Sequence, residues 1–209
     1  MPEGWTEDFT KQNEQFYTSK STLLFGQGKT LFSPISGDND RSDMISSRDP
    51  FPFSGQNSIV YTDLTQRYSI SKKMIYGQDL LVQDSLHPIK WKLTGEFRDV
   101  AGYSCRRANG LIMDSVYVVA FYTNEIHLSA GPESFNGLPG MILEVFLPHD
   151  HVSWTAQKVT EEKIANENIP PPSSKTKTIN RKEMTEWIER SLKDMSTQLK
   201  GLLKKGLLI

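Results

Sequence analysis

The sequence has little of what catalysis, metal binding or membrane insertion usually require. It holds one cysteine in 209 residues, which excludes an internal disulfide and a Cys-rich metal site. The nucleophile pattern Gly-x-Ser-x-Gly does not occur, and no apolar run approaches the ~20 residues of a membrane-spanning helix. The 24 Lys and Arg residues are balanced by 25 Asp and Glu residues, so the positive excess of nucleic-acid-binding proteins is missing. We therefore expect a protein that is not an enzyme, binds no nucleic acid and has no transmembrane segment.

The first twenty residues lack the features of a secretion signal. Acidic residues stand where a signal peptide is basic, and no apolar core follows them. We expect either a cytoplasmic protein or a chain that begins downstream of a leader.

Short apolar segments separated by turn residues dominate residues 1–169. Residues 115–122 are apolar on both faces of an extended chain, and residues 141–147 repeat this around one acid, Glu144. The pair Asn109-Gly110 predicts a hairpin turn between neighbouring strands. The pattern predicts a mainly β domain, either an antiparallel barrel or a curved half-barrel sheet.

The end of the chain has a different pattern. Residues 170–179 begin with three prolines and two serines, which is typical of a stiff linker. Asn180 and Glu183 form a capping-box pattern at the start of a predicted amphipathic helix within 180–209. Its apolar stripe is expected to dock on the sheet, with a partner- or membrane-surface arm as the alternative.

Three groups of residues could carry chemistry. His149 and His151 flank Asp150, and two imidazoles at that spacing could share a transition metal with a third ligand such as His127 or Glu144. The alternative is an exposed polar connection without a metal. Cys105 could be a reactive thiolate but is better read as a small buried residue. Glu144, if buried, needs a partner such as Arg106 or Arg107.

One stretch of the sequence is more specific than these three groups of residues. Gly137-Leu138-Pro139-Gly140-Met141-Ile142, followed by Leu143 and Glu144, resembles the signature of the GLPGLI family, with Met141 in place of a Leu. Trp91, residues 102–105 and residues 120–126 extend the resemblance, which is strongest over about 91–144. The glycines on either side of Leu138-Pro139 favour a sharp turn into the next strand, with Phe135 and Leu138 as anchors in the core.

The resemblance implies a bacterial protein of the Bacteroidetes type, located in the periplasm or outer cell envelope after loss of a leader. The family has no established catalytic activity to carry over, and no cofactor is predicted apart from the transition metal considered above. We expect a non-catalytic binding module for a lipid-like, apolar or amphipathic ligand. Two alternatives stay open: a metal-handling accessory protein using His127, His149 and His151, or a structural subunit that docks on an envelope protein through its C-terminal helix. Large side chains with apolar area are the expected liners of a concave face: Trp91, Tyr103, Tyr122, Phe146 and Trp154.

Overall fold

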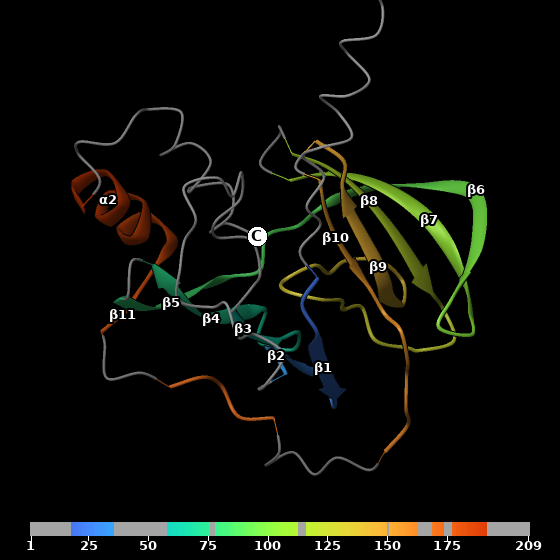
Figure 1. Ribbon diagram of the computed structural model, residues 1–209, viewed down its shortest axis with the longest axis horizontal. Helices are drawn as coiled ribbons and strands as arrows, with labels where there is room; N and C mark the ends of the chain where they lie inside the picture. Colours follow the sequence, from blue (N-terminus) through green and yellow to red (C-terminus); the bar gives the residue numbers. More distant parts are fainter. Residues whose placement is uncertain are drawn as a thin grey trace, which may run out of the picture.

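The described part of the chain forms two β-sheets and a helix (Figure 1). The computed structural model describes residues 18–35, 58–75, 78–112, 116–149, 151–162, 169–173 and 177–191. Within these residues the strands pair almost entirely antiparallel, in two separate sheets rather than one closed ring. The prediction of a mainly β fold with antiparallel sheets is confirmed.

The first sheet, sheet A, is a meander in the order β1-β2-β3-β4-β5, with β11 added parallel to β5. The β1–β2 turn places Gln27 and Gly28 at φ of 47° and 77°, the left-handed pair that suits the twist of a two-residue hairpin. The strands are β1 (Ser21–Gly26), β2 (Lys29–Pro34), β3 (Ile59–Asp63), β4 (Tyr68–Ile75), β5 (Gln78–Ser85) and β11 (Thr178–Ile179).

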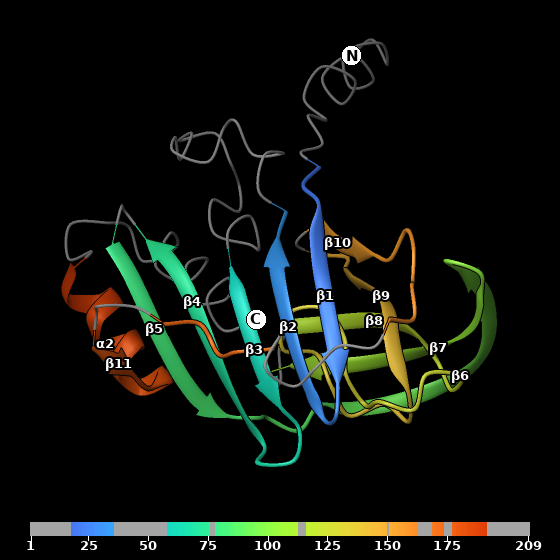
Figure 2. The same cartoon turned by 90° about the horizontal axis from the view of Figure 1, so that it is seen from below.

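The second sheet, sheet B, is a second meander in the order β10-β9-β8-β7-β6. A break in register between Leu93 and Phe97 of β6 interrupts the pairing of β6 with β7. In Figure 2, β6, β7 and β8 run across the strands of sheet A, with β8 passing behind β1, and β6 and β7 curve away from the body. The strands are β6 (Lys90–Val100), β7 (Tyr103–Ile112), β8 (Val116–Thr123), β9 (Met141–Leu147) and β10 (Val152–Thr155).

Both faces of sheet B are covered by apolar side chains, which explains why β8 is apolar on both sides. One face, called the loop face here, buries Val118 and Tyr122 beneath Phe135 and Leu138 of the 124–140 loop. The opposite face, called the β1 face, packs its cluster against Leu23 and Phe25 of β1. Because alternate residues of a strand point to opposite faces, the sequence of β8 is divided between two cores.

Asn109-Gly110 does not form the predicted turn. Both residues lie inside β7, where Gly110 pairs with Trp91 of β6 and Val118 of β8. A Cβ atom at Gly110 would lie 2.8 Å from the Trp91 ring. Gly110 therefore makes room for the indole of Trp91 on the neighbouring strand. The sequence alone does not distinguish a glycine needed for this contact from a glycine needed for a turn.

The C-terminal helix α2 (Arg181–Ser191) begins at the predicted capping box. The Asn180 side chain accepts a hydrogen bond from the backbone N–H of Glu183, and the Glu183 carboxylate accepts one from the N–H of Asn180, each of 2.9 Å. Met184 and Ile188 are fully buried, and the helix lies beside β5 (Figure 1), so its apolar stripe docks on the sheet.

Two further points concern the C-terminal part of the chain. The last residues of the predicted 170–179 linker, Thr178 and Ile179, are ordered as β11. The rest of the predicted helix, residues 192–209, lies outside the described residues. No helix in the described part of the chain is long and apolar enough to cross a membrane.

Candidate functional site

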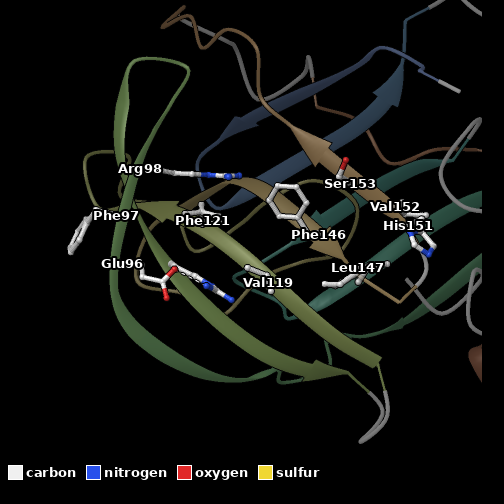
Figure 3. A pocket seen from close by; sticks show the side chains of 12 residues that line it. Glu96, Phe97, Arg98, Val119, Phe121, Phe146, Leu147, His151, Val152 and Ser153 are labelled. Atoms are coloured by element: carbon white, nitrogen blue, oxygen red, sulfur yellow. Dashed lines mark hydrogen bonds and ion pairs between the residues drawn. The ribbon is translucent and has the colours of Figure 1, made fainter. Parts of the chain in front are cut away.

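An open pocket of about 650 Å³ lies on the β1 face of sheet B, and every strand of that sheet contributes to its lining. Figure 3 shows these side chains from close by. The pocket is lined by Glu96, Phe97, Arg98, Arg107, Val119, Phe121, Phe146, Leu147, Pro148, His151, Val152 and Ser153.

The floor of the pocket is apolar. Val119 and Phe121 come from β8, and Phe146 comes from β9, where it pairs with Val119. The rings of Phe121 and Phe146 meet edge to face, with centroids 6.4 Å apart. Leu147 and Val152 close the end of the floor at the β9–β10 connection. This arrangement provides a surface of aromatic and aliphatic carbon that an apolar group can cover.

Arg98 crosses this floor and links its own strand, β6, to β8 and β9. Its guanidinium lies 3.8 Å from the centre of the Phe121 ring and 5.0 Å from that of Phe146, and it forms an ion pair with Glu144. Glu144 is almost fully buried and also accepts a hydrogen bond of 2.9 Å from the Thr155 hydroxyl. Burial lowers the pKa of Arg98, and the ion pair and the two rings hold its charge in place.

The partner of Glu144 differs from the prediction, which named Arg106 or Arg107. Arg106 pairs in register with Tyr122 and belongs to the loop face, where its guanidinium lies over Phe97. The bulge after Leu93 changes which β6 side chains face the β1 side of sheet B. Arg98, which follows the bulge, therefore faces Glu144.

The rim of the pocket is polar. The Arg107 guanidinium donates a hydrogen bond of 2.6 Å to the Glu96 carboxylate, which is largely exposed. The bond to Glu96 raises the pKa of Arg107. Exposed Ser153 and His151 stand on the opposite rim. Phe97 points away from the pocket in Figure 3, so its side chain adds nothing to the floor.

The five predicted liners do not share one surface. Trp91, Tyr122 and Trp154 pack in the cluster of the loop face, whereas Tyr103 and Phe146 belong to the β1 face. Of the five, Phe146 lines the pocket. The division follows from strand register: Trp91 lies opposite Gly110 and Trp154 opposite Val145, and both partners face the loop side.

The signature turn packs into the core of the loop face. Phe135 and Leu138 are both buried, as predicted for anchors. Gly137 has a φ of 93°, and a Cβ atom at Gly140 would overlap the carbonyl oxygen of Thr123. A glycine at position 140 therefore lets the loop backbone lie against the end of β8 immediately before β9 begins at Met141.

The three histidines are not brought together. His127 follows the end of β8, whereas His149 and His151 follow the end of β9, and these strands are antiparallel. His127 therefore lies at the other end of the sheet from the pair. Within the described residues, no group of three His, Cys, Asp or Glu side chains has metal-binding geometry. A metal held by His149 and His151 stays a prediction.

Cys105 is a buried free thiol, as expected, and burial raises its pKa to about 11. A thiol with this pKa stays protonated at neutral pH and is a poor nucleophile.

Two buried residues of opposite charge, one in the loop before β9 and one in sheet A, have no signal in the sequence. Glu133, in the loop before β9, is 2% exposed, and neither carboxylate oxygen has a hydrogen-bond partner. Lys73 of β4 is buried as well, and the two charges attract each other. Burial raises the pKa of Glu133 to about 6 and lowers that of Lys73. Both residues read as ordinary surface charges until the fold places them together.

Comparisons with known proteins place the chain beside an uncharacterised family. A family model described as "Protein of unknown function (Porph_ging)" matches residues 109–144, which include the signature turn and end at Glu144. No curated protein sequence matches the chain. One structure of PNGF-II, in space group P21, is similar over 83% of this chain with 12% identity and a TM-score of 0.53.

A second structure of PNGF-II, in space group C2, is similar over 62% of this chain with 15% identity and a TM-score of 0.45. The chain spans 30% of the first PNGF-II chain and 22% of the second. At these identities the likeness concerns the fold alone.

Proposed function

We propose that the protein is a non-catalytic binding module that holds an amphipathic ligand in the pocket on the β1 face of sheet B. The observation that carries this proposal is the pocket's composition: an apolar floor of Val119, Phe121 and Phe146 below a rim of charged and polar side chains. An apolar group would cover the floor and keep its polar end at the rim, in water.

The volume of the pocket suits a single ligand. About 650 Å³ lies within the range of small-molecule sites and corresponds to an acyl chain or a few fused rings. The pocket is built on paired strands rather than on loops, so its floor is fixed before a ligand arrives. A preformed site loses little conformational entropy when a ligand binds, which favours affinity.

A cell-envelope location is part of this proposal and rests on the resemblance to the GLPGLI family. The similar fold in PNGF-II forms part of a longer chain. This supports the proposal that the fold can serve as a module.

The test is a fluorescence titration with N-phenyl-1-naphthylamine, an uncharged apolar probe. Ser153 is exposed and lines the pocket, so Ser153→Trp fills the pocket without altering a core. We expect saturable 1:1 binding to the wild-type protein and at least tenfold weaker binding to S153W. Ser104→Trp is the matched control, because Ser104 is an exposed strand serine whose register places it on the other face of sheet B. Equal binding by all three proteins would contradict the proposal.

A further inference from the structure

The charged groups at the pocket neutralise one another in pairs. Arg98 is paired with Glu144, and Arg107 is paired with Glu96. These two guanidinium groups and two carboxylates therefore sum to zero net charge, and His151 on the opposite rim is the remaining titratable side chain of the lining. A site that attracts an anionic head through free arginines would leave at least one guanidinium without a carboxylate, and here each has one.

The two pairs differ in how readily a ligand can enter them. Glu144 is buried, and Arg98 stacks on two rings, so separating them would leave a carboxylate without its counter-charge in an apolar setting. The side chain of Glu96 is 62% exposed, and an exposed ion pair contributes little to stability. The Arg107–Glu96 pair is therefore the one whose groups can turn to a ligand, and it offers donors and an acceptor side by side.

We propose that the polar head of the ligand carries no net charge and is either hydroxylated or zwitterionic. This inference rests on the function proposed above and narrows it. Hydroxyl groups both donate and accept hydrogen bonds, and a zwitterion carries one charge of each sign, so either head matches the guanidinium and carboxylate of Arg107 and Glu96 together. A head with a single charge would satisfy one member of the pair and face the other as a like charge.

The experiment displaces N-phenyl-1-naphthylamine from the full chain with four amphiphiles that share a twelve-carbon chain, each below its micellar concentration. The uncharged heads are dodecyl maltoside and dodecylphosphocholine, and the charged heads are dodecanoate and dodecyltrimethylammonium. We expect at least one uncharged head to displace the probe at a concentration threefold or more below both charged heads. Whether maltoside or phosphocholine is stronger separates a hydroxylated head from a zwitterionic one. Stronger displacement by dodecanoate or dodecyltrimethylammonium would overturn the inference.

A charge variant tests the same point without relying on differences between heads. Glu96→Gln leaves Arg107 without its carboxylate, and we expect dodecanoate to displace the probe at a concentration at least fivefold lower than with the wild type. Glu125→Gln removes an exposed acid that does not line the pocket and should change nothing. If E96Q shows no gain for dodecanoate, the neutralising role of Glu96 is wrong. If the probe does not bind the wild type at all, the proposed function fails instead, so the two failures are distinct.

Discussion

The indole nitrogen of Trp91 donates a hydrogen bond of 2.9 Å to the backbone carbonyl of Asn136. This bond connects the start of β6 to the 124–140 loop at the residue immediately before Gly137. The ring also lies over Gly110 of β7 and reaches within 3.4 Å of a Cβ position at Gly137. Trp91 therefore fixes the signature loop on the loop face, and its role is to hold the scaffold rather than to meet a ligand.

The first prediction concerns this bond. Trp91→Phe removes the N–H and part of the ring, and we expect it to lower the free energy of unfolding by about 1 kcal/mol more than Trp154→Phe does. Trp154 loses the same volume, packs edge-on against Phe135 and makes no indole hydrogen bond within the described residues. Urea denaturation of both variants measures the difference. Equal losses would show that the bond to Asn136 contributes nothing.

The second prediction concerns the turn into β9. Gly140→Ala forces a Cβ against the Thr123 carbonyl, and the backbone has to move. We expect a loss of about 2–3 kcal/mol, as for an overpacked core position. Gly95→Ala is the control, since a Cβ atom there meets nothing within 4 Å. The midpoint of urea unfolding should fall for G140A and stay within error for G95A. A tolerated G140A would refute the close approach.

The third prediction concerns the pH dependence set by Glu133. Its pKa rises from 4.5 to about 6 on folding, chiefly through burial. Between pH 4.5 and about 6, Glu133 is therefore protonated in the folded state and ionised in the unfolded state. The free energy of unfolding falls as the pH rises through this window, by a total of about 2 kcal/mol. We expect Glu133→Gln to remove this decline.

Measuring the free energy of unfolding at pH 4.5 and 7.5 tests this, with Glu125→Gln as the control for an exposed acid of the same loop. The lowered pKa of His87 makes stability rise with pH, the opposite direction, and the comparison with wild type cancels it. If E133Q and wild type change in parallel with pH, Glu133 does not titrate as stated.

The fourth prediction concerns the ion pair across the pocket floor. Arg98→Met leaves Glu144 buried without its partner and should destabilise the protein markedly. Combining it with Glu144→Gln should restore part of the loss, giving a coupling energy of about 1–3 kcal/mol in a double-mutant cycle. A cycle built on Arg107 and Glu96 should give less than about 1 kcal/mol, because that pair is exposed. Equal couplings would show that burial of Glu144 does not matter.

The sequence predicted the element types well, for identifiable reasons. Two-sided apolar runs marked β8 and β9 as central strands, and Asn180 with Glu183 marked the start of α2. Leu138 was recognisable as an anchor because it stands alone between glycines and a proline. These signals are local, so they could be read without a fold.

The site was less predictable because it depends on register. Whether an aromatic side chain faces the pocket or the loop depends on which residue it pairs with, and the bulge after Leu93 shifts this pairing in β6. Arg98 could not be identified as the partner of Glu144 without that bulge. Lys73 of β4 and Glu133 of the 124–140 loop lie sixty residues apart in the sequence, and nothing near either residue signals that both become buried.

The most direct test of the binding account is native mass spectrometry of the full chain isolated from a Gram-negative periplasm, compared with its denatured mass. The account predicts an excess of several hundred daltons that extracts into organic solvent, is present in the wild type and in Ser104→Trp, and is absent from Ser153→Trp. An excess that persists in S153W would place the ligand elsewhere. A wild-type protein without excess mass, and without affinity for the apolar probe, would contradict a binding function for this pocket.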